Sequence, residues 1–363
     1  MWFYYGIIII MLICWAYSHQ KQLTLSRKYE ICGTEFSNHK SYIVFCSLLF
    51  VFLIGCRAET VGIDAWNYKM TYLRMNNASF QDLSTITWLS ESGYTVLLIG
   101  LNKLGFSWNG YFILAAAIFV LPVMLLVFRE SENVFFSVIL FVMLGYFVFP
   151  MSTMRQSIAI GFCILAFFQL EKRQYLRYAL LTFIASSFHV SALITFLLFI
   201  VSFIKPKKNN VYVWTGIAFF VVILGVSPLR NVFTMVLSSI GKDYQSVDTG
   251  GWLREIFFIV TILLSLYVNW NDNEFIDQHK FSYFSVLIAA VLLPIVKYHP
   301  ALSRLYFYFS IQEIILIPSL IARLNNLKLK LLGGVCYFAG AAYMMLLQLP
   351  SKNVIPYLFF WNM

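Results

Sequence analysis

The sequence predicts an all-α protein that crosses a membrane many times. Of its 363 residues, 60% are hydrophobic and only 12% are charged. A soluble protein of this composition would have too little polar surface to stay in solution. Apolar runs recur along the whole length, which indicates a polytopic helical membrane protein and not a soluble domain with one anchor. We therefore expect a single transmembrane domain over residues 1–363.

Twelve apolar segments are predicted to be transmembrane helices, although several are shorter than the roughly 20 residues of a full crossing. They lie at about 2–17, 42–56, 110–128, 134–150, 155–170, 175–188, 190–204, 211–227, 253–270, 281–297, 305–321 and 331–347. The first has no basic residues before it and no small-residue cleavage site after it. It is therefore predicted to be a retained span and not a signal peptide.

Lysine and arginine clusters orient these segments, because cytoplasmic loops carry an excess of both residues. The four clusters are Lys21, Arg27, Lys28 and Lys40; Lys172, Arg173 and Arg177; Lys205, Lys207 and Lys208; and Arg323, Lys328 and Lys330. All four lie inside only if both termini are outside and the segment 91–128 crosses once. The stretch 94–105 is then a re-entrant or interfacial helix, and the sizeable outer loops are about 57–93 and 228–252.

The charge and cysteine content exclude several classes of protein. The net charge of +10 would suggest a nucleic-acid partner for a soluble protein, but basic cytoplasmic loops explain it here. The six cysteines show no metal-ligand spacing, and the sequence has no Gly-rich phosphate loop, nucleophile elbow or zinc-protease motif. We therefore expect no nucleic acid, metal or cofactor, and an activated substrate would have to arrive by another route, such as on a lipid.

Three arginines stand at the predicted outer N-termini of spans, where the charge rule does not favour them: Arg155, Arg254 and Arg304. A helix N-terminus offers unpaired N–H groups and a positive dipole end, and a guanidinium added there suits a phosphate or carboxylate. For Arg155, with Gln156 beside it, we favour such an anion site over snorkelling to lipid headgroups. For Arg254 the two interpretations stay open. Arg304 would share a helical face with Tyr308.

Further ionisable residues lie near the same predicted face. His189 interrupts an apolar segment, where a titratable group is costly and usually functional. It is either a structural hydrogen-bonder, to Ser186 or a carbonyl, or a base or phosphate donor. In the first outer loop, Asp64 and Glu91 flank apolar stretches, and Asp64 would share a helical face with Tyr68.

The ordered motifs of the chain resemble those of the EpsG/Wzy family of bacterial polysaccharide polymerases. They are Arg57 to Tyr68 with its Gly-x-Asp, Glu91-Ser92-Gly93-Tyr94, Met154 to Ala159, Phe188 to Leu193, Arg304 with its aromatic neighbours, and Pro356-Tyr357. Each motif alone is weak, but the set spans nearly the whole chain and is fairly specific at the level of the family.

The resemblance implies a glycosyltransferase of GT-C-like architecture in the bacterial inner membrane, with its active site facing the periplasm. It would transfer the growing glycan from undecaprenyl pyrophosphate to a lipid-linked repeat unit. The candidate bases, which the sequence does not rank, are His189, Asp64 and Glu91. The residues expected to contact pyrophosphate or glycan are Arg155, Arg304, Arg57, Gln156, Tyr68 and Tyr308. The expected partners are the undecaprenyl-pyrophosphate-linked oligosaccharide, membrane lipids and a chain-length regulator protein.

Other membrane functions stay open. A flippase for lipid-linked oligosaccharide also needs cationic intramembrane residues, but it should carry them on both leaflets or along a central cavity and show repeat symmetry. The unexpected arginines of this chain are predicted on one side. An O-antigen ligase shares the lipid pyrophosphate donor, and neither it nor a membrane acyltransferase is distinguished by sequence.

Overall fold

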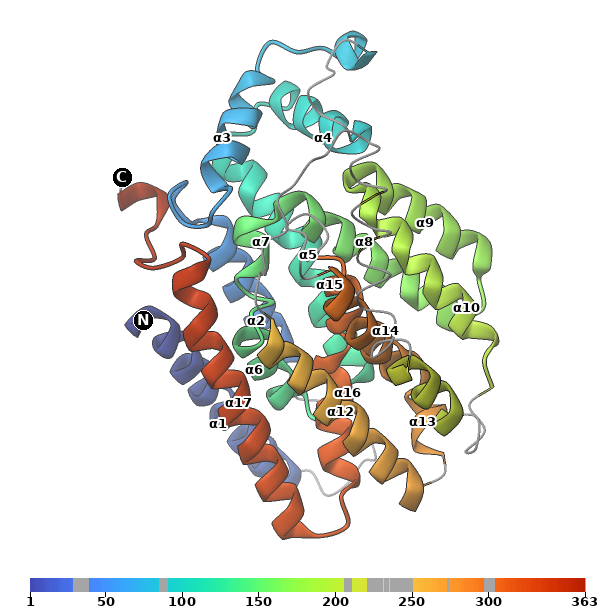
Figure 1. Ribbon diagram of the computed structural model, residues 1–363. Coiled ribbons are helices and arrows are strands. Elements are labelled where there is room, and N and C mark those ends of the chain that lie inside the picture. The colour runs from blue at the N-terminus through green and yellow to red at the C-terminus, as the bar shows by residue number, and fades with distance from the viewer. Residues whose placement is uncertain are drawn as a thin grey trace. The chain divides into compact units, whose positions relative to one another are not determined.

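The computed structural model describes residues 1–28, 39–84, 91–205, 211–220, 231, 235, 251–272, 274–296 and 304–362 (Figure 1). These residues are almost entirely helices and turns, which confirms the predicted all-α class. The chain divides into two compact units, one formed by Met1–Leu193 with Ala341–Met363 and the other by Ile194–Gly340. Most of the predicted outer loop 228–252 lies outside the described residues.

The first unit is a helical bundle that carries two short helices at one end, α3 and α4 (Figure 1). Its elements are α1 (Trp2–Lys28), α2 (His39–Gly55), α3 (Ala65–Arg74), η1 (Phe80–Ser84), α4 (Ser92–Lys103), α5 (Trp108–Glu130), α6 (Val134–Met143), α7 (Phe149–Ser152), α8 (Met154–Glu171), α9 (Tyr175–Phe188), the end of α17 (Leu327–Ser351) and η3 (Phe360–Asn362). Helix α5 packs against α2 and α8, and α8 packs along α9. Their apolar faces form the core of this unit.

The second unit is built around α14 (Lys280–Val296), which packs against α10, α12, α15 and α16. Its elements are α10 (Leu197–Phe203), a helical stretch Val211–Phe220, α12 (Trp252–Asn271), α13 (Phe275–Gln278), α15 (Phe307–Ser310), α16 (Glu313–Arg323) and the first part of α17. The 3-10 helix η2 (Val190–Phe196) joins the two units in sequence.

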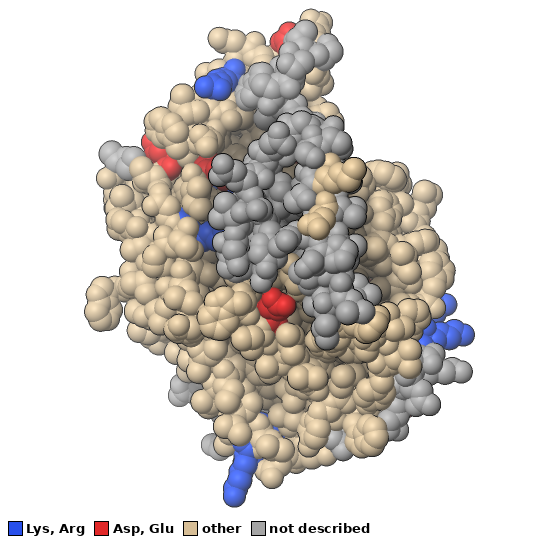
Figure 2. All heavy atoms as spheres, viewed as in Figure 1, with Lys and Arg blue, Asp and Glu red and all other residues tan. Residues whose placement is uncertain are grey.

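Several helices have the length and composition of membrane spans. Among the described residues, Trp108–Glu130, Trp252–Trp270 and Leu327–Ser351 are long and apolar enough to cross a bilayer, and six shorter apolar helices accompany them. On the face drawn in Figure 2, charged side chains are few and well separated. These features support a membrane-embedded protein, whereas the number of twelve spans stays a prediction.

Two predicted spans are interrupted. The segment 134–150 is not one helix, because α6 ends at Met143 and α7 begins at Phe149. Gly145 lies between them with a φ of 84°, in the left-handed region that favours glycine, and a Cβ there would lie 1.8 Å from Oε1 of Gln348. The segment 305–321 is likewise divided between α15 and α16.

The stretch 94–105, predicted to be a re-entrant or interfacial helix, corresponds to α4. This helix has 12 residues, which gives a length of about 18 Å. Since the hydrocarbon core of a bilayer is about 30 Å thick, α4 is too short for a full crossing. It belongs instead to the end of the bundle at which α8 begins and α9 ends.

Candidate functional site

The candidate site lies where α4 and α8 begin and α9 ends, all within the first unit (Figure 1). Glu91 is the N-cap residue of α4, and Arg155 is the second residue of α8. His189 ends α9 in an extended conformation, with φ −156° and ψ 114°. Each residue therefore stands at a helix terminus, where its side chain can leave the helix and meet the others.

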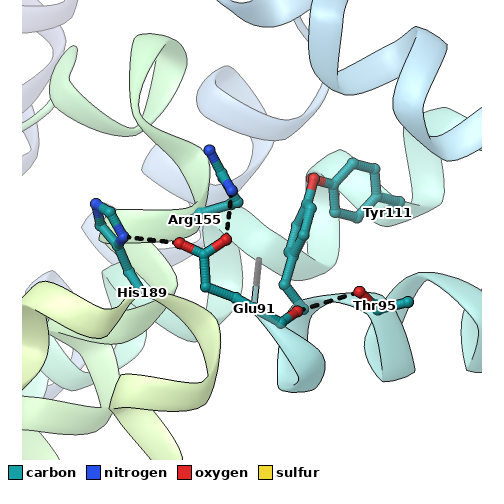
Figure 3. A network of polar contacts seen from close by, with 6 residues as sticks. Glu91, Thr95, Tyr111, Arg155 and His189 are labelled. Atoms are coloured by element: carbon teal, nitrogen blue, oxygen red, sulfur yellow. Dashed lines mark hydrogen bonds and ion pairs between the residues drawn. The ribbon is translucent and has the colours of Figure 1, made fainter. Parts of the chain in front are cut away.

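The carboxylate of Glu91 joins these three residues (Figure 3). Arg155 donates from Nη1 to Oε2 of Glu91 at 2.5 Å, and Nδ1 of His189 lies 3.2 Å from Oε1. The hydroxyl of Thr95 donates to the backbone carbonyl of Glu91 at 3.1 Å, which fixes the start of α4. Residues far apart in the sequence thus meet at one carboxylate.

Glu91 is more deeply buried than the two residues that contact its carboxylate, Arg155 and His189. The side chain of Glu91 is 7% exposed, whereas Arg155 is 34% and His189 30% exposed. A buried carboxylate is costly unless a cation and hydrogen bonds compensate it, and Arg155 supplies the cation. Because an ionised carboxylate only accepts hydrogen bonds, its contact with His189 places the imidazole proton on Nδ1 and makes Nε2 the nitrogen that can accept a proton.

Buried tyrosines support the guanidinium of Arg155. Its Cζ atom lies 5.7 Å from the centroid of the Tyr94 ring. The hydroxyl oxygens of Tyr94 and Tyr111 are 2.7 Å apart, and the Tyr111 ring stacks on Tyr72 with centroids 5.2 Å apart. All three tyrosines are at most 1% exposed. Packed aromatic rings of this kind restrict the positions that the arginine can adopt.

Helix α3 brings Tyr68 into the surroundings of Arg155, and Asp64 precedes this helix. Asp64 is the half-buried N-cap residue, and its carbonyl accepts from the Tyr68 amide at 3.0 Å. Burial raises the pKa of Tyr68, the negative charge of Asp64 adds to this rise, and the positive charge of Arg155 opposes it. Tyr68 therefore lies within the electrostatic reach of both Asp64 and Arg155.

The sequence pattern of the EpsG family matches residues 40–359. The chain belongs to the EpsG family. No curated protein and no solved structure matches it. The matched range of this EpsG protein includes Glu91, Arg155 and His189, so the site described above lies within the region that the family shares.

Arg57, predicted to contact substrate, has structural partners in this EpsG protein. Its side chain is fully buried, and it donates to the carbonyl of Val61 at 3.1 Å, to that of Met151 at 3.3 Å and to that of Ile54. Its guanidinium also lies 4.4 Å from the centroid of the Phe112 ring. Donation to three backbone carbonyls stabilises the turn after α2 and leaves the predicted substrate contact of Arg57 without support.

For three other predicted substrate residues the structure gives burial and position along the chain. Gln156 is 3% exposed and Tyr308 is 4% exposed. Arg304 is partly exposed and precedes α15, where its carbonyl accepts from the Phe307 amide at 3.2 Å. Arg304 and Tyr308 belong to the second unit, and their roles stay predictions.

Arg254 does not have the surroundings expected of a residue that snorkels to lipid headgroups. Its Nη2 lies 2.6 Å from Oε2 of Glu313, and the two side chains are 5% and 0% exposed. The guanidinium carbon lies 5.2 Å from the centroid of the Phe258 ring. The snorkelling interpretation of Arg254 is therefore wrong in this structure, because a buried carboxylate and an aromatic ring enclose the guanidinium.

Sequence reasoning missed the residues that support the group. Tyr111 and Thr95 were not singled out, because a tyrosine and a threonine inside apolar helices are ordinary core residues. No spacing rule connects Tyr111 of α5 with Tyr94 of α4. Among the described residues, no group of three or more His, Cys, Asp or Glu side chains is placed to hold a metal ion.

Proposed function

We propose that this EpsG protein polymerises a surface polysaccharide at the outer face of the bacterial inner membrane. The growing glycan would leave undecaprenyl pyrophosphate and pass to the terminal sugar of a lipid-linked repeat unit. The observation that carries the proposal is the meeting of Arg155, Glu91 and His189, which places a cation suited to phosphate beside an oriented imidazole. About twelve spans, a GT-C-like architecture and a chain-length regulator as partner belong to the same proposal.

In this mechanism His189 is the general base. Its Nε2 accepts the proton of the acceptor hydroxyl while that oxygen forms a bond to C1 of the donor sugar. The bond between C1 and the pyrophosphate oxygen breaks, and its electron pair leaves with the pyrophosphate. Glu91 holds the imidazole through Nδ1 at 3.2 Å and stabilises the imidazolium that forms. Asp64 is the alternative base.

Arg155 stabilises the leaving group. A guanidinium has five N–H donors, so it can contact Glu91 and still offer a planar pair of donors to a phosphate. About a third of its side chain is exposed (34%), and it stands in the first turn of α8, where the helix dipole also favours an anion. Arg304 is the proposed second cation. Because pyrophosphate is a good leaving group, positioning and electrostatics are expected to supply most of the rate enhancement.

Deletion of the gene in its native host tests this proposal, with the length distribution of the surface glycan as the measurement. We expect a glycan one repeat unit long, since units are still flipped and attached but never joined. Wild-type protein supplied in trans should restore the polymer, whereas Glu91→Gln and His189→Ala should not. Asp82→Asn is the matched control, because it removes a carboxylate of the same loop that accepts from the Ser79 amide at 2.7 Å.

Each rival function gives a different result. Complete loss of surface repeat units, with lipid-linked units retained in the inner leaflet, would identify a flippase. Polymer of normal length that accumulates on the lipid carrier would identify a ligase. Restoration of full-length polymer by both Glu91→Gln and His189→Ala would show that this site does not carry the reaction.

A further inference from the structure

The start of α4 and the end of α9 touch at a glycine. A Cβ added to Gly93 would lie 2.0 Å from the Ser187 hydroxyl oxygen, 2.7 Å from the Ser187 Cβ and 3.0 Å from the Ser187 carbonyl oxygen. Rotation of the serine side chain would relieve the first contact but not the second, since Cβ does not move with the side-chain torsion. A side chain at position 93 therefore requires the two backbones to separate.

The backbone conformation does not explain the glycine. The glycines with positive φ among the described residues are Gly62, Gly105, Gly145 and Gly251. Gly93 is not among them, so its own conformation is open to any residue. A glycine is required at position 93 because there is no space for a side chain. This restriction applies only to the start of α4, because a Cβ added to Gly100 of the same helix meets no atom within 4 Å.

The contact between Gly93 and Ser187 lies next to the site on both helices, α4 and α9. Gly93 follows Glu91 by two residues, and Ser187 precedes His189 by two residues. The Ser187 hydroxyl donates to the carbonyl of Ile184 at 2.7 Å within α9, and the Ser187 Cβ is fixed to the helix backbone. The distance between the two backbones at this contact thus determines whether the Glu91 carboxylate reaches the His189 imidazole at 3.2 Å.

We propose that Gly93 is a positioning residue: its lack of a side chain lets α4 approach α9 closely enough for Glu91 to hold His189. Displacement of α4 by about 1 Å would break the 3.2 Å contact, and misplacement of that size costs roughly a hundredfold in well-positioned sites. The expected loss of polymerisation rests on the proposed function. The close approach of α4 to α9 at Gly93 does not depend on that function.

The test compares Gly93→Ala with Gly100→Ala, measuring polymer length and the amount of inserted protein. Gly93→Ala should reduce polymerisation per inserted protein by at least tenfold, whereas Gly100→Ala should leave it unchanged. Ser187→Gly, which removes both the hydroxyl and the Cβ that Gly93→Ala would meet, should restore most of the activity in the double variant. Ser187→Gly alone should stay close to wild type. A merely structural loss at position 93 would lower the amount of inserted protein and leave polymerisation per inserted protein unchanged, which would contradict the inference.

A second measurement does not depend on activity. Glu91→Cys and His189→Cys together should be joined rapidly in membranes by a short bis-methanethiosulfonate reagent, and addition of Gly93→Ala should slow that reaction several-fold. Single-cysteine variants control for the native thiols. Unchanged cross-linking and unchanged polymer length in Gly93→Ala would overturn the inference. If cross-linking slows as expected while Glu91→Gln still polymerises, the geometry stands and the proposed function fails.

Discussion

Two arginine–glutamate pairs of the same chemistry occupy different surroundings in the two units. In each pair the arginine lies in the first turn of a helix and the glutamate lies at the start of another, with N–O distances of 2.5 Å for Arg155–Glu91 and 2.6 Å for Arg254–Glu313. Arg155 is 34% exposed, whereas Arg254 is 5% exposed. The two pairs therefore have nearly the same N–O distance but differ in the exposure of the arginine to solvent.

The two ion pairs also differ in the side chains that lie next to them. The Glu91 carboxylate also contacts His189, a group that can accept a proton. Around Arg254 the neighbours are aromatic: Phe258 lies against the guanidinium, and Tyr306 meets the Phe258 ring edge-on with centroids 5.9 Å apart. An enclosed ion pair of this kind stabilises little beyond what an apolar pair would, because desolvation offsets the attraction. The comparison supports the proposed role of the Arg155–Glu91 pair at the substrate, whereas the Arg254–Glu313 pair joins α12 to α16.

The largest expected effect comes from replacing each pair by apolar residues. Glu91→Leu with Arg155→Met should abolish polymerisation while the protein still inserts, since no apolar pair can orient an imidazole or bind a phosphate. Arg254→Met with Glu313→Leu should keep most of the protein and most of the polymer. Immunoblots of membranes and glycan gels measure both properties.

Single substitutions separate the two pairs further. Arg254→Ala leaves the buried Glu313 carboxylate without its arginine, which costs about 3–5 kcal/mol, so the amount of folded protein should fall. Normal protein and normal polymer in Arg254→Ala, or loss of polymerisation at normal protein level in the Arg254→Met, Glu313→Leu variant, would contradict the structural role given to this pair.

The sequence predicts the features of this fold that depend on hydrophobicity, and it does not predict those that depend on the path of the backbone. Length and hydrophobicity predict that apolar segments form helices, and α8 and α9 lie where the segments 155–170 and 175–188 were expected. The break at Gly145 was missed, because hydropathy measures composition and carries no information on the path of the backbone. The approach of Gln348, some two hundred residues later, became visible only in the structure.

For the candidate site, the sequence predicts the individual residues but not the contacts between them. Arg155, Glu91 and His189 were predicted one by one, because charged groups in or beside apolar segments are conspicuous. Their meeting was not predicted, since the residues lie 64 and 98 positions from Glu91 and no periodicity links them. For Arg254 the sequence left two interpretations open, because the enclosure that excludes snorkelling depends on Glu313, which lies on a different helix.

A smaller change tests whether Arg155 acts through its shape as well as its charge. Arg155→Lys keeps the positive charge but replaces the planar fork by a point charge, which cannot bind a carboxylate and a phosphate in the same way. We expect polymerisation to fall by roughly a hundredfold, with normal insertion. Arg177→Lys is the matched control, because Arg177 lies on α9 and donates to Gln174 in an exposed contact. Near-normal polymer in Arg155→Lys would mean that the site needs only a charge.

The smallest expected effect concerns a glutamate at the opposite end of α8 from Arg155. Glu171 lies outside the apolar segment 155–170, and burial, followed by the charge of Glu130, raises its pKa from 4.5 to about 7. Arg129 and Lys172 oppose this rise without cancelling it. This carboxylate is therefore more easily protonated in the folded protein than in the unfolded chain.

The sign of the pH dependence follows from that shift. A group whose pKa is raised by folding disfavours the folded state once it ionises, so the stability present below pH 4.5 is lost as the pH rises to about 7. Glu171→Gln should leave the Tm of the purified protein in detergent unchanged at pH 4.5 and raise it at pH 8, by about 1–2 °C for an effect that solvent screening reduces to about 1 kcal/mol. Glu132→Gln, at an exposed position nearby, should change neither value. A Tm of Glu171→Gln that is lower than wild type at pH 8 would show that the carboxylate is stabilised by its basic neighbours, as Glu91 and Glu313 are by theirs.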